Sequence, residues 1–147
     1  MEYTAGNVHK AIDMLAPFGG CMAWDNVGLL VGEPDSAVTG ILVTLDVTPA
    51  AVAQALEMRM NCIVSHHPII FHPLKHISAR DAAGLCLANG ISVISAHTNY
   101  DFAPRGVNCA LAQTLGLRNI RPFGPEDKEK PWYSIIAVSY THLRAHE

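Results

Sequence analysis

The sequence predicts an α/β fold with a largely parallel sheet that carries helices on both faces. Short, mainly apolar runs at residues 41–45, 62–65 and 91–96 alternate with stretches of helical periodicity. These runs do not alternate between apolar and polar residues, which is typical of parallel strands covered on both faces. Each run leads directly into a histidine or an aspartate. Polar side chains are therefore expected at the carboxyl ends of the strands, where ligands bind in such sheets.

The chain begins with a predicted helix and a short strand. We expect the helix between a cap at Thr4 or Asn7 and Pro17, because apolar residues recur there with helical spacing. A turn that contains Trp24 follows, and we interpret Trp24 as a buried tryptophan. The strand at residues 29–31 comes directly after this turn.

Three strand–helix units follow. The first unit is a strand at 40–46 and a helix at 49–60 with Thr48 as its cap. The second is a strand from Cys62, a loop at 68–78 and a helix at 80–89. The third is a strand at 91–96 and a helix at 107–115 that ends at Gly116. The helix at 80–89 is apolar almost all round, which predicts burial on both of its faces. Gly90 lies where a glycine commonly ends a helix.

Composition limits the class of protein. The 147 residues, half of them hydrophobic and 16% charged, predict a folded domain. The formal charge of -3, without a basic cluster, argues against a nucleic-acid polymer as partner. No apolar run reaches membrane-spanning length and no signal peptide is recognisable, so we expect a cytoplasmic protein. The four cysteines, Cys21, Cys62, Cys86 and Cys109, form no CxxC pair, and we expect buried, reduced thiols.

The residues after two of the strands suit divalent metals. His66 and His67 follow one strand, and His97 and Asp101 follow the next. Consecutive residues of an extended chain point to opposite sides, so His66 and His67 each suit a different ion, and a carboxylate can bridge the two. Two ions about 3.5–4 Å apart are the usual arrangement for metal-assisted hydrolysis. We therefore predict His66, His67 and Asp101 as metal ligands.

Other side chains near this cluster leave alternatives open. His97 is either a further ligand or a group that orients one. We interpret Asp46 as a cap of the following helix, and His72 and His76 as solvated loop residues. The absence of thiolates leaves zinc, iron, manganese, cobalt and nickel as candidates. These ligands are too few for two four-coordinate ions, so other acids, water or a further segment must complete the site.

Three motifs stand out by their residues and spacing: Trp24-Asp25-Asn26-Val27-Gly28-Leu29, residues 65–75, and Ala96-His97-Thr98-Asn99-Tyr100-Asp101. Together they resemble the dinuclear-metal-centre family of GTP cyclohydrolase 1 type 2 homologues, also called interacting-factor-3-like, over roughly residues 1–125. The resemblance implies an α/β fold in a toroidal homohexamer with two divalent metal ions per full-length chain. It implies His66, His67 and Asp101 as metal ligands with His97 near them, and metal-dependent hydrolysis of a nucleotide-like substrate such as GTP.

The sequence also departs from this family. Members are longer, and a C-terminal His-x-x-x-Glu motif completes their dinuclear centre; the spacing of His142, His146 and Glu147 does not match it. We therefore expect an N-terminal fragment, with residues 1–125 as the metal-binding half. Residues 126–138 would be a linker and the first strand of an inserted domain, with little chain left to pair with. Residues 139–147 resemble translated adapter sequence and are expected to be non-native. The alternative to a hydrolase is a non-catalytic, metal-binding hexameric scaffold.

Overall fold

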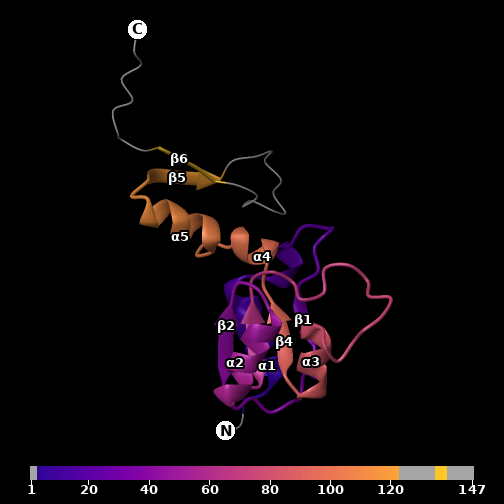
Figure 1. Cartoon of the computed structure of the whole chain (residues 1–147). Helices are drawn as coiled ribbons and strands as arrows, with labels where there is room; N and C mark the ends of the chain where they lie inside the picture. Colours follow the sequence, from indigo (N-terminus) through magenta and orange to yellow (C-terminus); the bar gives the residue numbers. More distant parts are fainter. Residues whose placement is uncertain (1–2, 123–134, 139–147) are drawn as a thin grey trace.

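The fold is built on a mixed four-stranded sheet (Figure 1). The computed structural model describes residues 3–122 and 135–138. The strand order is β1-β4-β3-β2, formed by Gly28–Val31, Ser92–Ser95, Cys62–Ser65 and Ile41–Thr44. Strands β2, β3 and β4 are parallel, as predicted, whereas β1 runs antiparallel to β4. The sheet is thus parallel in its main part and has an antiparallel strand at one edge.

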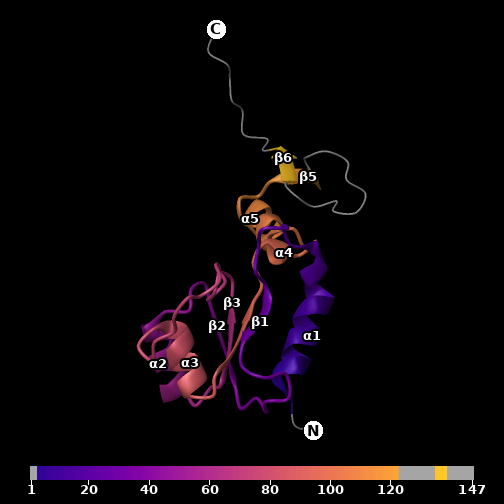
Figure 2. The ribbon, with the colours of Figure 1, turned by 90° about the vertical axis from the view of Figure 1, so that its right-hand side faces the viewer.

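Helices lie on both faces of this sheet (Figure 2). Helices α2 (Pro49–Glu57) and α3 (Ala82–Ala88) cover one face, and α1 (Ala5–Leu15) lies on the other side beside β1. The core between α2, α3 and the sheet includes Val52, Ala55, Ile63, Cys86 and Val93. Full burial of one such valine or isoleucine contributes about 1.5–3 kcal/mol, so this layer dominates the stability of the domain.

Local signals in the sequence set the ends of several helices as predicted. The Thr4 side chain accepts a hydrogen bond from the Asn7 N–H, and the Asn7 side chain accepts one from the Thr4 N–H, which is a capping box. The Thr48 hydroxyl accepts from the Ala51 N–H at the start of α2. Gly90 and Gly116 follow α3 and α5 (Val107–Thr114) with φ angles of 64° and 67°, a region that favours glycine.

Two sequence-based expectations about helices are corrected. Helix α3 is not buried on both faces, because Leu87 is 61% exposed while Ala83 and Cys86 are buried. An unpredicted short helix, α4 (Thr98–Asp101), begins directly after His97. A 3-10 turn at Phe18–Gly20 follows α1. None of the described helices is long and apolar enough to cross a membrane.

A second, two-stranded sheet follows α5. Strand β5 (Arg118–Pro122) pairs antiparallel with β6 (Ile135–Val138), so the strand expected near residue 138 does have a partner. The predictions for residues 126–134 and 139–147 lie outside the described residues.

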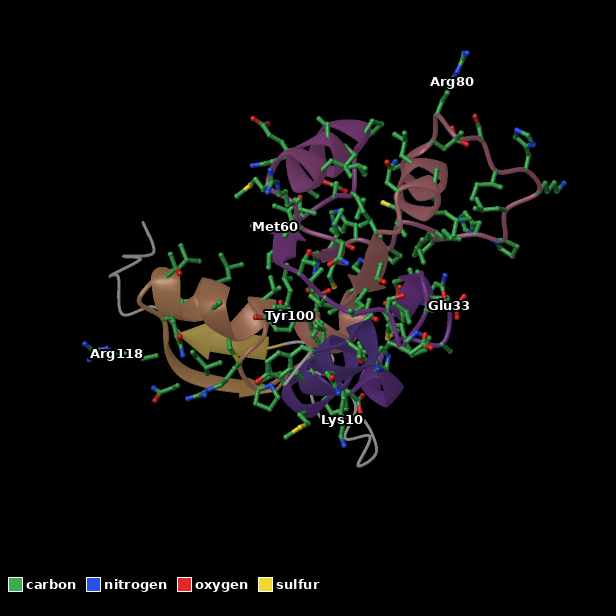
Figure 3. All side chains as sticks on the ribbon, turned by 90° about the horizontal axis from the view of Figure 1, so that it is seen from below. Lys10, Glu33, Met60, Arg80, Tyr100 and Arg118 are labelled. Atoms are coloured by element: carbon green, nitrogen blue, oxygen red, sulfur yellow. The ribbon has the colours of Figure 1, made fainter. Side chains whose placement is uncertain are left out.

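On the main body, the side chains of Lys10 and Arg80 point away from the centre of the molecule (Figure 3). Arg80 lies near the end of the loop that follows β3, in which residues 71–77 are exposed and Ile69 and Ile70 pack against the core.

Candidate metal centre

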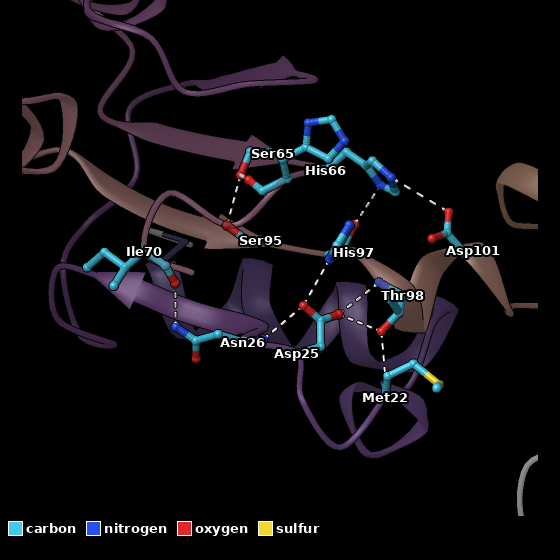
Figure 4. A network of polar contacts seen from close by, with 12 residues as sticks. Met22, Asp25, Asn26, Ser65, His66, Ile70, Ser95, His97, Thr98 and Asp101 are labelled. Atoms are coloured by element: carbon cyan, nitrogen blue, oxygen red, sulfur yellow. Dashed lines mark hydrogen bonds and ion pairs between the residues drawn. The ribbon is translucent and has the colours of Figure 1, made fainter. Parts of the chain in front are cut away.

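The histidines come together because two parallel strands end at the same level. The register pairs Ser65 at the end of β3 with Ser95 at the end of β4. Their hydroxyl oxygens lie 2.8 Å apart in the interior and tie the two strand ends together. His66 follows the first strand directly, and His97 follows the second after one residue. Both imidazoles therefore lie at one edge of the sheet (Figure 4).

Three imidazoles converge at this edge. Each of His66, His67 and His97 offers one ring nitrogen, and these three nitrogens all lie within 4.8 Å of one another. The ring centroids of His66 and His67 are 5.0 Å apart, although consecutive residues of a strand would point apart. The expectation of opposite sides is wrong here because the chain bends at both histidines and leaves the extended conformation.

The spacing fits the binding of divalent metal. Ligand nitrogens about 2.0–2.1 Å from one tetrahedral ion lie about 3.3 Å from each other. Nitrogens as far as 4.8 Å apart can therefore bind one ion after small side-chain rotations, or they can bind two different ions. The carboxylate of Asp101, in α4, lies 3.6 Å from Nε2 of His66 and is partly exposed. A carboxylate at this position can join the histidines around a metal.

Each of the three imidazoles has its Nδ1 against an oxygen atom. A carbonyl or carboxylate oxygen can only accept, so Nδ1 donates and the lone pair lies on Nε2, the nitrogen free to bind metal. The three pairs are His66 Nδ1 with the Ala96 carbonyl at 3.1 Å, His67 Nδ1 with Asp46 at 2.7 Å and His97 Nδ1 with Asp25 at 2.9 Å. Such partners fix both the tautomer and the orientation of a metal-binding histidine.

Asp25 is the residue that sequence reasoning missed. Its side chain is inaccessible to solvent and also accepts hydrogen bonds from the N–H and hydroxyl of Thr98. Burial would raise the pKa of the Asp25 carboxyl, but hydrogen bonds from His97, Thr98 and the Asn26 N–H together hold this pKa below its ordinary value. The carboxylate therefore stays ionised opposite His97. The only sequence signal for Asp25 was its place in the first motif, where an Asp-Asn pair before a glycine is typical of a turn.

Asp46 has a different role from the one predicted. Thr48, not Asp46, caps helix α2. The Asp46 carboxylate instead accepts from His67, and both side chains are about half exposed, at 57% and 46%. Asp46 therefore orients a histidine of the cluster from the solvent side.

The cysteines and the loop histidines lie apart from this cluster. Burial raises the pKa of both Cys62 and Cys86 to about 11, so these thiols are neutral near pH 7 in the metal-free protein. All four cysteines are within the described residues, and none is in a disulfide. The expectation of burial holds for Cys62 and Cys86 but is wrong for Cys21 and Cys109, which are partly exposed. His72 and His76 are exposed in the loop after β3, as predicted.

An apolar groove opens beside the histidines. It has a volume of about 550 Å³, and His66 and His67 form part of its wall. Most of the lining is apolar and comes from α1, from the ends of β2 and β3 with the residues that follow them, and from α4 and the start of α5; it includes Leu15, Val43 and Leu45. These three side chains are each more than half exposed. The face of the sheet beside β2 is thus far less covered than the face beneath α2 and α3.

Comparisons with known proteins identify the family. A family model described as Duf34/NIF3 (NGG1p interacting factor 3) matches residues 3–144. A Staphylococcus epidermidis protein named GTP cyclohydrolase 1 type 2 homolog is 46% identical over 108 residues, which are 71% of this chain and 29% of that protein. The homolog from Staphylococcus aureus is 43% identical over 113 residues, which are 74% of this chain and 31% of that protein. The chain thus spans less than a third of the length of these curated relatives.

Solved structures agree with this assignment. A hypothetical protein of Staphylococcus aureus superposes with a TM-score of 0.79 at 37% identity, over 84% of this chain and 42% of that one. A Bacillus cereus protein related to NIF3 gives 0.78 at 36% identity, over 84% of this chain and 36% of that one. The chain therefore belongs to the Duf34/NIF3 family, and the family predicted from the sequence motifs is confirmed.

Proposed function

We propose that this chain is the metal-binding part of a metal-dependent hydrolase that acts on a nucleotide-like substrate. The observation that carries the proposal is the convergence of ring nitrogens from His66, His67 and His97 within 4.8 Å. The Asp101 carboxylate, 3.6 Å from His66, adds an acidic ligand. The name of the Staphylococcus relatives, GTP cyclohydrolase 1 type 2 homolog, supports the nucleotide part of the proposal.

The side chains of this chain prepare the site for metal. Asp25, Asp46 and the Ala96 carbonyl hold the Nδ1 atoms, so that each imidazole offers Nε2. A divalent ion bound there supplies a Lewis acid and lowers the pKa of water toward neutrality. Three imidazoles and one carboxylate are fewer than the roughly eight ligand positions that two four-coordinate ions need. We propose that the longer relatives supply the remaining ligands from their additional length, and that the full-length protein is a cytoplasmic homohexamer with two ions per chain.

The test is GTP turnover by this chain extended with the C-terminal part of a relative. The zinc-loaded protein should open the guanine ring, measured by chromatography of the nucleotide. The His66→Ala/His67→Ala variant should be at least ~100-fold slower, because loss of the partners of metal ligands alone typically costs 10–100-fold. The matched control is His76→Ala, which removes an exposed histidine of the nearby loop. Equal turnover in His66→Ala/His67→Ala and in His76→Ala would refute the proposal.

A non-catalytic scaffold is the second candidate function. The family description as an interacting factor and the exposed apolar groove beside β2 favour it. Tight zinc binding without turnover of GTP or of simple phosphate esters, in the extended protein, would support the scaffold over the hydrolase. Saturable turnover that depends on His66 and His67 would exclude it.

A further inference from the structure

Two aromatic side chains lie exposed beside His97. The ring centroids of Trp24 and Phe71 are each 6.4 Å from the centroid of His97. They are 6.0 Å from each other, with a tilt of 56° between the rings. Trp24 is 58% exposed and Phe71 is 40% exposed. Large aromatic side chains usually bury most of their surface, so an exposed pair next to a candidate metal ligand points to a ligand as the missing contact.

The backbone around these rings is anchored independently of the rings. The Asn26 side-chain amide donates to the Ile70 carbonyl at 2.6 Å, which ties the loop of Trp24 to the loop of Phe71. The Met22 N–H donates to the Thr98 hydroxyl at 3.0 Å, on the other side of Trp24. Figure 4 shows both contacts within the network that holds Asp25 and His97. The two rings are therefore presented in place before any ligand binds, which lowers the entropic cost of binding.

We propose that Trp24 and Phe71 form a platform that binds the planar heteroaromatic ring of the substrate next to the metal ligands. This inference rests on the proposed function and specifies the part of the substrate that is recognised. Stacked or tilted aromatic rings have centroids about 4.5–7 Å apart. Both aromatic rings lie 6.4 Å from His97, so a ring bound on this platform lies on the same part of the surface as the candidate metal ligands. Stacking accepts any flat π-system, so the platform recognises a planar ring without distinguishing one heterocycle from another.

Charge and position distinguish this platform from the apolar groove. From His66 to Arg80 the chain contains Lys75 and Arg80 but no aspartate or glutamate. This loop therefore adds no negative charge beside the platform. Neither Trp24 nor Phe71 lines the apolar groove, which lies along α1 and β2. The ring platform is thus a surface separate from the groove.

Tryptophan fluorescence tests this inference directly. The chain has two tryptophans, so Trp132→Phe leaves Trp24 as the reporter. Guanosine monophosphate should quench the Trp24 emission of the zinc-loaded chain saturably, whereas ribose 5-phosphate, which lacks the ring, should not. The same titration after EDTA treatment should retain quenching, because the platform contacts the ring and not the metal. Equal quenching by both compounds, or no saturable quenching by the nucleotide, would overturn the inference.

Variants give a second readout by calorimetry. Trp24→Ala and Phe71→Ala should each weaken binding of guanosine monophosphate by at least ~5-fold, the lower range for one lost ring stack. Trp24→Phe, which keeps a ring, should restore most of the affinity. Leu74→Ala removes a 52% exposed side chain from the same loop and is the matched control. With folding verified by circular dichroism, affinities of the two alanine variants equal to that of the control would overturn the platform.

Metal content separates this inference from the proposed function. Trp24→Ala and Phe71→Ala should keep the zinc content of the wild type, because neither side chain is a candidate ligand. Ring binding without zinc binding in the wild type would refute the metal-dependent hydrolase and retain the platform. Zinc binding by a wild type that does not bind guanosine monophosphate would refute the platform and retain the metal site.

Discussion

Two histidine–carboxylate pairs support the cluster from opposite sides, and they differ in environment more than in distance. His97 and Asp25 are 2.9 Å apart, with the carboxylate inaccessible to solvent. His67 and Asp46 are 2.7 Å apart, with both side chains about half exposed. Asp25 also accepts from Thr98, whereas Asp46 lies toward water. Distance alone would rank the exposed pair first, but burial and the additional donors make Asp25 the stronger support.

The largest expected difference is in folding stability. Asp25→Ala should lower the free energy of unfolding by about 3 kcal/mol, because it leaves buried donors of Thr98 and His97 without an acceptor. Asp46→Ala should cost less than ~1 kcal/mol, since exposed pairs contribute little. Denaturant unfolding of both variants measures this difference. Equal losses would show that the two environments are not distinct.

Replacing Asp25 should also reduce metal affinity more than replacing Asp46 does, but the free-energy difference between the two variants should be smaller than for folding stability. Asp25→Asn should weaken zinc binding by ~10–100-fold, because the amide no longer enforces the His97 tautomer that leaves Nε2 open. Asp46→Asn should weaken zinc binding only a few-fold. Competition with a zinc chelator gives both affinities, and nitrogen NMR of His97 in the metal-free protein reports its tautomer. An unchanged tautomer in Asp25→Asn would contradict the assigned role.

Acid should remove the contribution of Asp25. The pKa of this carboxyl is lowered below its model-peptide value of 3.8, so the ionised form stabilises the fold. Its contribution is complete above the unfolded pKa and is lost as the pH falls through the lower folded pKa. The stability difference between wild type and Asp25→Asn should therefore shrink as the pH falls below 3.8. A difference that grows on acidification would have the wrong sign.

Salt should produce the smallest effect and sharpen the contrast. At 1 M salt the Debye length falls to ~3 Å, which screens exposed charges but hardly reaches buried ones. The few tenths of a kcal/mol lost in Asp46→Ala should then vanish, while the loss in Asp25→Ala should persist. Unfolding of both variants with and without salt measures this. A salt-sensitive Asp25 would mean that water reaches the carboxylate.

Local features of this fold could be predicted from the sequence, and long-range partners could not. The caps at Thr4 and Thr48 depend on neighbouring residues and were predicted. The strand ends that bring His66 and His97 together follow from the apolar runs and the parallel register. The antiparallel direction of β1 could not be predicted, because a four-residue strand does not reveal its pairing partner.

Partnerships within the candidate site were harder to predict. Asp25 meets His97 across 72 positions of sequence, a contact that depends on how two loops pack. Trp24 was expected to be buried and is instead 58% exposed, because a turn does not indicate what covers its side chains. His66, His67 and Asp101 remain predicted ligands. The structure places them together with His97, which the sequence left undecided between ligand and orienting group.

The central claim is that the histidines at the ends of β3 and β4 bind metal. The most direct test is zinc content by mass spectrometry, after zinc loading and gel filtration, of the wild type and the His66→Ala/His67→Ala variant. The His72→Ala/His76→Ala variant, which alters two exposed loop histidines, is the control. We expect zinc to remain bound in the wild type and the control and to be lost from the His66→Ala/His67→Ala variant. Equal zinc content in all three folded proteins, or none in the wild type, would contradict the claim.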